Sequence, residues 1–212
     1  PVLSLKADRI DVRFIRLNSN QGPAAARNTG AEQADQPIIL FIDADVEMQR
    51  LTLKRIQDAF ETNPEISAVQ GIYTSSAPEG FNTVTRYQNH YYHFAFKTIQ
   101  AEYPAVCATY CFAVKRDVFV SAGGFDTSIK KPTVEDEAFG YRLTELNHKI
   151  QLHRGVQVTH LAHYQFDTLI LRKFRMSFNQ VKSLLRGVKP PVNSGDGHNK
   201  THHSKDTLGA VL

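Results

Sequence analysis

The stretch "PIILFIDADVE", residues 37–47, joins an apolar run to two acidic residues. The run at residues 37–42 contains no polar side chain, which is typical of a strand covered on both faces of a sheet. Asp43 and Asp45 follow at once, separated only by Ala44. In open α/β sheets, ligands bind beyond the carboxyl ends of the strands, so this pattern predicts that both acids lie beside a ligand site.

The spacing of Asp43 and Asp45 raises a question of charge. Two carboxylates held this close repel each other, and the pKa of one rises unless a cation lies between them. Mg²⁺ or Mn²⁺ would remove the repulsion, because hard divalent ions prefer oxygen ligands and share them with the phosphates of a substrate. The plainer alternative is a turn in which one Asp caps the following helix. The pair alone leaves both alternatives open.

The rest of the chain alternates between strand-like and helix-like segments. Apolar patterns and turn residues predict strands, besides the one at 37–42, at residues 11–17, 65–74, 105–114 and 157–165. They predict helices at residues 23–34, 50–64, 81–100, 115–126, 134–146 and 167–187. In the second of these helices the expected core stripe is Leu51, Leu53, Ile56 and Phe60. The alternation predicts an α/β fold with a mostly parallel sheet flanked by helices.

Composition narrows the classes of function. The chain has 212 residues, 42% hydrophobic and 22% charged, which is enough for one sizeable globular domain. A net charge of +4 suits an anionic ligand, but the chain has no long Lys/Arg run and no Trp, which argues against nucleic acid. No apolar run reaches the roughly 18 residues of a membrane span. Cys107 and Cys111 are too far apart along a strand for an easy disulfide, so we expect buried, reduced thiols and a cytoplasmic location.

Two further stretches carry chemistry. In "NQGPAAARNTG", residues 20–30, a Gly-Pro turn opens a helix, and Arg27 follows one turn later. A helix N-terminus attracts phosphate oxygens, and an arginine can fork onto an anion. In "GGFDTSIKKPTVEDEAFGYRL", residues 123–143, a glycine turn precedes a helix that opens with Glu135 and Asp136. The simpler explanation of those acids is a favourable interaction with the helix dipole.

Taken in order, five pieces of the chain resemble family-2 glycosyltransferases, which have the GT-A fold, a Rossmann-like sheet flanked by helices. The pieces are "NQGPAAARNTG", "ILFIDADVE", "FAVKRDVFVSAGGFD", "VEDEAFGYRL" and "VTH", and they cover roughly residues 11–186. The first strand and turn that are usual in the family have no match before residue 11. The resemblance therefore implies an N-terminally truncated GT-A domain over residues 1–186, followed by a polar, flexible tail at residues 187–212.

On the donor side, the resemblance implies that a nucleotide-sugar binds against Gly22, Arg27, Asp43 and Asp45. Asp43 would face the nucleoside or its ribose. Asp45 would hold the Mg²⁺ or Mn²⁺ that bridges the donor diphosphate, and His160 of "VTH" would bind either that metal or the diphosphate.

On the acceptor side, the resemblance implies that Gly124, Phe125 and Asp126 line the site. Asp136 would be the general base for the acceptor hydroxyl, with Glu135 beside it. One base suffices when the hydroxyl attacks opposite the leaving group, so we expect an inverting enzyme.

The expected partners follow from the same resemblance. They are a nucleotide-sugar donor and a hydroxyl acceptor on a glycan, a lipid-linked molecule or another compound, in polysaccharide or cell-envelope synthesis. The helix at residues 167–186 is basic and amphipathic, so it could lie on the cytoplasmic face of an anionic membrane. The alternative is a helix that packs on the domain and presents a basic outer face.

Two other functions compete with glycosyl transfer. Haloacid-dehalogenase-like phosphatases also place two acids after an apolar strand, and Asp43 would then be the nucleophile. Those enzymes usually continue with Gly-Thr, whereas Val46 and Glu47 follow here. The second alternative is a sugar-nucleotide binding module without catalytic activity.

Overall fold

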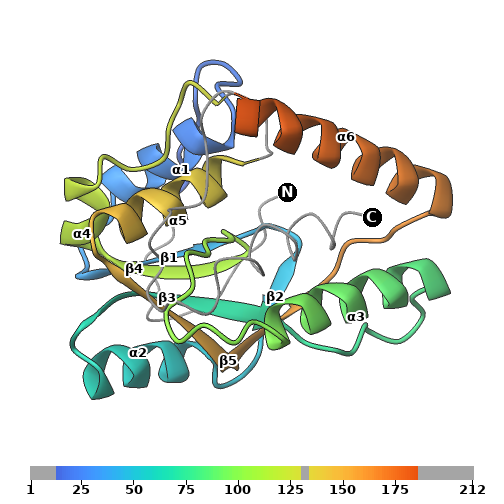
Figure 1. Ribbon diagram of the computed structural model, residues 1–212, viewed down its shortest axis with the longest axis horizontal. Helices are drawn as coiled ribbons and strands as arrows, with labels where there is room; N and C mark the ends of the chain where they lie inside the picture. The colour runs from blue at the N-terminus through green and yellow to red at the C-terminus, as the bar shows by residue number, and fades with distance from the viewer. Residues whose placement is uncertain (1–12, 130–133, 186–212) are drawn as a thin grey trace.

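The computed structural model describes residues 13–129 and 134–185. Within these ranges, five strands form one sheet in the order β1-β4-β3-β5-β2 (Figure 1). The strands are β1 (Ile38–Ile42), β2 (Val46–Met48), β3 (Ile66–Tyr73), β4 (Cys111–Lys115) and β5 (Lys149–His160). The sheet crosses the middle of the molecule, and helices lie on both of its faces.

The sheet is mixed, so the expectation of a mostly parallel sheet is wrong. Only β3 and β5 pair in parallel, whereas the β1–β4, β3–β4 and β2–β5 pairs are antiparallel. Residues 98–110, which lead into β4, contain no helix or strand. This long link lets the chain enter β4 from the opposite end, which a short βαβ crossover would not allow. Because β4 is antiparallel to both of its neighbours, β1, β3 and β5 still run in one direction.

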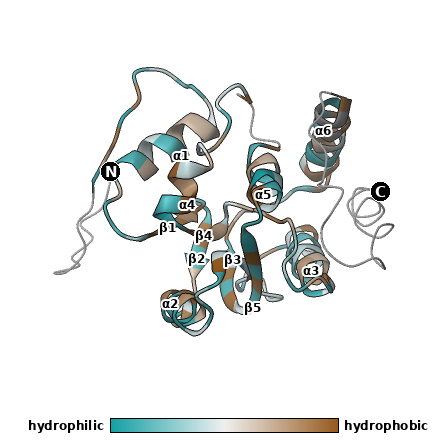
Figure 2. Ribbon diagram, turned by 60° about the vertical axis from the view of Figure 1, so that its left-hand side comes forward, coloured by the Kyte–Doolittle hydropathy of each residue, from teal (hydrophilic) through white to brown (hydrophobic). Residues whose placement is uncertain are grey.

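The helices are α1 (Pro23–Glu32), α2 (Thr52–Thr62), α3 (Thr83–Lys97), α4 (Arg116–Ser121), α5 (Glu135–Glu145) and α6 (Phe166–Leu185). In Figure 1, α1, α4 and α5 lie on one side of the sheet, and α2 and α3 lie on the other. α6 lies at the periphery of the molecule in both ribbon views (Figures 1 and 2). No helix in the two described ranges combines the length and apolar character needed to cross a membrane.

Each face of the sheet has its own hydrophobic core. On the side of α1, α4 and α5 the core centres on aromatic rings, among which Phe41, Phe119 and Phe125 meet edge to face or tilted. On the α2 side, Ile56 and Phe60 pack against β3 and β5. Together the two cores fix the direction in which the strand ends point, which positions the site below.

Several local expectations are corrected. Residues 13–17 are irregular, and residues 13–16 are exposed, although the alternation predicted a strand (residues 11 and 12 lie outside the described ranges). Alternation alone does not make a strand without a neighbour to pair with, and β1 pairs only with β4 among the described residues. Of the predicted strand at 105–114, only the part from Cys111 onward is strand. Leu51 and Leu53 are exposed, because the buried face of α2 instead runs through Thr52, Ile56, Ala59 and Phe60.

The segment before β4, residues 98–110, is held by side-chain contacts rather than by the backbone hydrogen bonds of strand pairing. The amide of the buried Gln70 side chain donates to the carbonyls of Ala108 and Cys111, and its oxygen accepts from the backbone N–H of Ala108 at 2.7 Å. Gly140 lets α5 approach the same segment, since a Cβ there would lie 2.9 Å from the Cβ and backbone nitrogen of Cys107. Cys107 and Cys111 are both buried and free, as expected.

Candidate active site

The carboxyl ends of β1, β3 and β5 share one edge of the sheet, because these three strands are parallel to one another. Asp43 follows β1 directly, and His160 is the last residue of β5. The short strand β2, which the sequence did not predict, pairs Val46 with His160. This pairing brings Asp45 to the end of β5, where its backbone carbonyl accepts from the N–H of Leu161 at 2.8 Å.

Asp45 and His160 face each other at this edge. His160 Nε2 lies 3.4 Å from Asp45 Oδ2, and the Asp45 side chain is 50% exposed whereas that of His160 is 5% exposed. Burial lowers the pKa of His160, while the charge of Asp45 acts in the opposite direction. A neutral imidazole beside an open carboxylate is a donor set that can bind a divalent ion. Across the described residues no third His, Cys, Asp or Glu completes a cage, so further ligands would come from substrate or water.

Asn89 of α3 fixes the orientation of His160. Its side-chain oxygen lies 3.4 Å from Nδ1 of His160, and its amide nitrogen contacts the carbonyl of the same residue at 3.5 Å. The ring of Tyr73, at the end of β3, lies 4.9 Å from the imidazole. With Nδ1 engaged, Nε2 is the nitrogen that faces Asp45. The sequence contained no signal for Asn89, since a buried polar residue on a helix has no distinctive pattern.

Arg27 connects the two halves of the site. It lies on α1, which begins after Gly22 with Pro23 in the first turn. One guanidinium nitrogen donates to Glu135 at 2.8 Å, and another donates to Asp43 at 3.3 Å. The sequence predicted that Arg27 would fork onto an anion. In the structure the fork is made to two carboxylates of the protein, which places the first turn of α5 beside the end of β1.

The three acids that begin α5 differ in environment. Glu135 has a side chain only 4% exposed and pairs with Arg27. Asp136 is partly buried, and burial together with the charge of Glu135 raises its pKa to about 7, although hydrogen bonds from backbone N–H groups and the charge of Arg27 oppose the rise. Burial and Asp136 raise the pKa of Glu137 to about 7 as well. Glu137 is thus more than an exposed partner of the helix dipole.

The glycine turn after α4 is joined to α1. The amide of Asn28 donates to the carbonyl of Phe125, and its oxygen accepts from the N–H of Phe125, both at 2.9 Å. Gly124 has a φ of +65°, and a Cβ there would meet the Asn28 side chain at 2.9 Å. The Phe125 ring is buried in the core, and Asp126 is engaged by the backbone N–H of Ser128. Of the predicted acceptor residues, Phe125 therefore has a buried ring and a backbone N–H and carbonyl that are already engaged by Asn28.

Comparison with known protein families shows which family the chain belongs to. The model of Glycosyl transferase family 2 matches residues 2–121, more than half of the chain. The chain belongs to glycosyl transferase family 2. The matched region includes α1, β1 and the Asp43–Asp45 pair, and it ends at Ser121, before the first turn of α5.

Curated relatives match at moderate identity. A pre-mycofactocin glycosyltransferase of Mycobacterium tuberculosis is 26% identical over 170 residues, which cover 77% of this chain and 35% of the relative. A teichoic acid poly(glycerol phosphate) polymerase of Staphylococcus epidermidis is 30% identical over 69 residues, 32% of this chain and 10% of the relative. The chain thus spans about a third or less of the length of the curated relatives it matches.

Solved structures confirm the GT-A type of fold expected for a family-2 chain. The mannosyltransferase PcManGT from Pyrobaculum calidifontis, in complex with GDP-Man and Mn²⁺, matches with a TM-score of 0.58 and 18% identity over 82% of this chain and 46% of its own. GalNAc-T7, solved with UDP, GalNAc and Mn²⁺, matches with a TM-score of 0.53 and 14% identity over 71% of this chain and 32% of its own.

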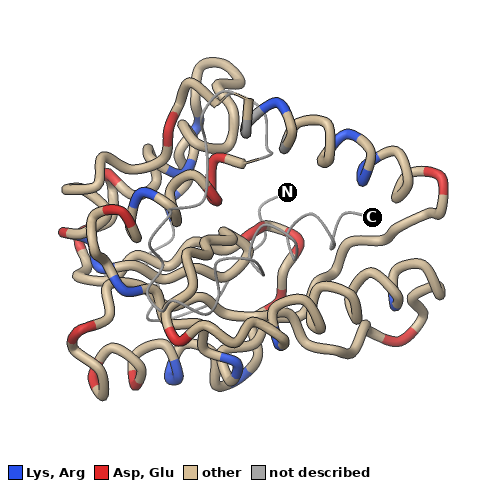
Figure 3. Tube along the Cα trace, viewed as in Figure 1, with Lys and Arg blue, Asp and Glu red and all other residues tan. Residues whose placement is uncertain are grey.

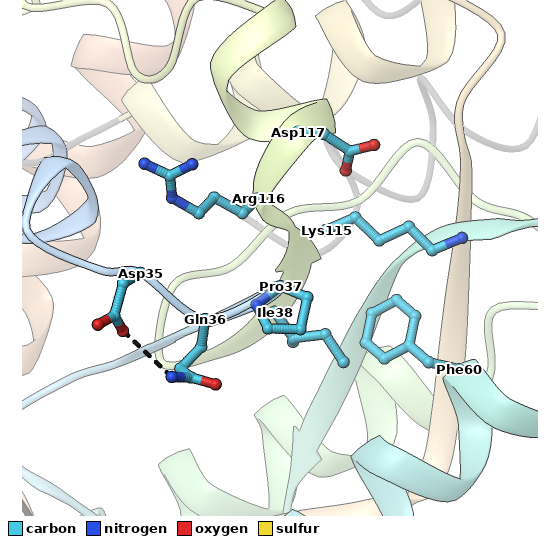
Figure 4. Close-up of a pocket in the computed structure, with 8 residues that line it drawn as sticks. All are labelled: Asp35, Gln36, Pro37, Ile38, Phe60, Lys115, Arg116 and Asp117. Carbon is cyan, nitrogen blue, oxygen red and sulfur yellow. Dashed lines mark hydrogen bonds between the residues drawn. The ribbon is translucent and has the colours of Figure 1, made fainter.

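A separate depression lies at the opposite end of β1 from the acids of this family-2 chain. Its lining is Asp35, Gln36, Pro37, Ile38, Phe60, Lys115, Arg116 and Asp117 (Figure 4). The cations there already donate to backbone carbonyls, Lys115 to Pro64 and Arg116 to Ala34, each at 2.7 Å. The depression therefore offers no free cation for an anionic substrate, and the carboxyl edge remains the candidate active site.

Proposed function

We propose that the chain carries out glycosyl transfer from a nucleoside diphosphate sugar to an acceptor hydroxyl. The observation that carries the proposal is the Arg27 bridge, which holds the donor-side acid Asp43 and the first turn of α5 together at one edge of the sheet. Membership of glycosyl transferase family 2 supports the reaction class and argues against a phosphatase with Asp43 as nucleophile.

On the donor side, Asp45 and His160 would hold Mn²⁺ or Mg²⁺. The carboxylate and the neutral imidazole fit such an ion, and two structural neighbours were solved with Mn²⁺ and a nucleotide or nucleotide-sugar. A bound divalent ion would neutralise the charge that grows on the leaving diphosphate. Asp43 would contact the nucleoside, and the turn at Gly22 would border it.

On the acceptor side, Asp136 would take the proton of the attacking hydroxyl. Glu135 is engaged by Arg27, which leaves Asp136 as the better base of the adjacent pair. A pKa of about 7 matches proton transfer near neutral pH. With one base and attack opposite the leaving group, the anomeric centre would be inverted, which NMR of the product would reveal. Retained stereochemistry would contradict this mechanism.

The acceptor class is proposed more broadly. A hydroxyl on a glycan or on a lipid-linked molecule, in synthesis of a cell-envelope polymer, is supported by the teichoic acid polymerase among the relatives. A location in the cytoplasm or at the cytoplasmic face of a membrane stays a prediction. So does the division into a domain at residues 1–186 and a tail, because residues 186–212 lie outside the described ranges.

A screen of nucleotide-sugars with Mn²⁺ and Mg²⁺ tests the proposal. Wild type, Asp45→Ala and the control Asp58→Ala would be compared, since Asp58 is an acid on α2 that pairs only with the exposed Lys54. We expect turnover and Mn²⁺-dependent nucleotide binding to be lost in Asp45→Ala and kept in Asp58→Ala. Nucleotide binding without turnover of any sugar would instead support a non-catalytic binding module. If Asp45→Ala binds nucleotide and Mn²⁺ like wild type, the proposed donor site is wrong.

A further inference from the structure

A long apolar stripe on α6 is open to solvent. Besides Met176, which lies on another side of the helix, seven large apolar side chains of α6 are exposed: Phe166, Ile170, Leu171, Phe174, Phe178, Val181 and Leu185. Most are spaced three or four residues apart, so they lie along one side of the helix. Phe174 is 70% exposed and Leu185 is 83% exposed. A contiguous apolar surface of this kind on a folded protein usually marks an interaction site.

A different side of α6 attaches the helix to the rest of the protein. Leu169 is buried, and the Lys173 ammonium lies 4.3 Å from the centre of the Tyr91 ring on α3. Arg172 donates to the hydroxyl of Tyr164 at 3.3 Å and lies over its ring. The stripe therefore lies on a different side of α6 from the one that packs on the described part of the domain. This arrangement contradicts the alternative in which the outer face of the helix is basic.

Two cations lie along one border of the apolar stripe. Arg175 and Lys182 are exposed, lie seven residues apart on the side next to Leu171 and Phe178, and form no ion pair within the described part of the chain. Asp167, in the first turn, is the one acid of α6. Figure 3 shows the basic residues spaced along the helix and the acidic position at its start. The surface is thus apolar in its centre and positively charged along one border.

We propose that α6 docks on an anionic lipid surface, with the stripe at the boundary of headgroups and acyl chains and with Arg175 and Lys182 against lipid phosphates. An apolar face bordered by Lys and Arg is the pattern that binds such surfaces. A second copy of the chain fits less well, because stripe-to-stripe pairing would bury cations from both copies in one interface without acids to match them. This contact goes beyond glycosyl transfer and does not depend on it.

The docking surface is connected to the candidate active site. α6 begins six residues after His160, and the Tyr164 ring lies between the two, 5.6 Å from the imidazole of His160 and 5.4 Å from the guanidinium of Arg172. The backbone of Tyr164 is tied to α3 by Asn82 and by Thr85. A membrane bound by α6 would therefore lie on the side of the protein that carries His160.

The absence of Trp from the chain allows a direct test. In the Phe174→Trp variant the only indole is on the stripe, so its emission should shift to the blue on addition of vesicles of phosphatidylcholine and phosphatidylglycerol. Vesicles of phosphatidylcholine alone should bind more weakly. Because each surface cation contributes on the order of 1 kcal/mol to binding of anionic lipid, Arg175→Gln and Lys182→Gln should each weaken binding about fivefold.

Cosedimentation of the whole chain with the same vesicles supplies the second measurement. Phe174→Ser with Phe178→Ser should reduce the bound fraction at least about tenfold. Val120→Ser should bind like wild type, since Val120 is an equally exposed apolar residue on α4. Circular dichroism would check that each variant folds. If the serine variant does not fold, Arg175→Gln and Lys182→Gln still test the proposal, because they leave the stripe intact. Equal binding by wild type and the serine variant, no binding to anionic vesicles, or a stable dimer that the serine substitutions dissociate would each overturn the proposal.

Discussion

The first turn of α5 shows how neighbouring acids acquire different chemistry. Glu135 is buried against Arg27, and this ion pair holds the helix beside Asp43. Asp136 lacks such a short ion pair, and burial beside Glu135 raises its pKa to about 7. Environment rather than residue type thus distinguishes the carboxyl group that holds the helix from the neighbour that we propose as the base.

Replacing Asp136 with Asn removes the proposed base and keeps the shape of the side chain. We expect turnover to fall about 10²- to 10⁴-fold, with little change in nucleotide binding, because general-base catalysis contributes that much. Steady-state kinetics and a binding titration with the nucleotide would separate the two effects. The paired variant Glu137→Gln should lose much less activity. If Glu137→Gln is the more damaged variant, the base is misassigned.

The same residues predict a pH dependence of stability without substrate. The pKa values of Asp136 and Glu137 are raised from 3.8 and 4.5 to about 7, so the folded state holds these protons more tightly than the unfolded state. The stability they contribute is present below about pH 4 and is lost as the pH rises through 7. We expect Asp136→Asn to melt at a higher temperature than wild type at pH 8, with a smaller difference at pH 5. Calorimetry at both values would check this, and an equal difference at both would contradict it.

At the scale of elements, α5 approaches the segment before β4 closely, and this contact positions the first turn of α5 in the candidate site. Gly140 faces the backbone of Cys107, and Gln70 holds the next residues of that segment through backbone groups. Helix α5, which carries the proposed base, is therefore positioned by a backbone contact that only glycine permits, in addition to the Arg27 ion pair.

Two glycine substitutions in helices should have opposite effects. Alanine is favoured over glycine in a helix by about 1 kcal/mol, so Gly30→Ala in α1, where a Cβ meets nothing within 4 Å, should raise the free energy of unfolding by up to that amount. Gly140→Ala would place its Cβ 2.9 Å from the backbone nitrogen of Cys107, and the clash should outweigh the gain and destabilise by about 1–3 kcal/mol. Urea denaturation measures both. Equal effects in the two variants would mean that α5 can shift away from the segment.

At the scale of the whole molecule, the described strands and helices enclose both thiols. Cys107 and Cys111 lie on opposite sides of the sheet, one in each hydrophobic core, and burial raises the pKa of both, that of Cys111 to about 12. Neither thiol forms a reactive thiolate in the folded protein near neutral pH.

Alkylation should therefore report opening of the cores. In native buffer we expect iodoacetamide to leave both cysteines unmodified, and in urea we expect two modified thiols at a rate that follows unfolding. Mass spectrometry at successive times would resolve each site. Rapid modification of Cys107 alone in native buffer would show that the segment before β4 opens locally.

The sequence predicted the class of fold, and it also pointed to the sheet edge where the candidate site lies, because an apolar strand ending in Asp43 and Asp45 is a local signal. The direction of β4 and the existence of β2 were not predictable, since pairing depends on residues far apart in the chain. The ion pair between Arg27 and Glu135 was not predictable for the same reason, because the two residues are 108 positions apart in the chain. The basic character of α6 was visible in sequence, whereas exposure of its apolar side requires knowing which side packs on α3.

The reciprocal bonds between Asn28 and Phe125 have a consequence for engineering of specificity. They join α1, on the proposed nucleotide side, to the turn on the proposed acceptor side, and a Cβ at Gly124 would collide with the Asn28 side chain. A chimaera that imports α1 from a relative would bring a foreign residue against that turn. Recombination in this protein should therefore exchange residues 22–28 and 123–125 as one inherited unit, and libraries that shuffle them separately should be poor in folded members.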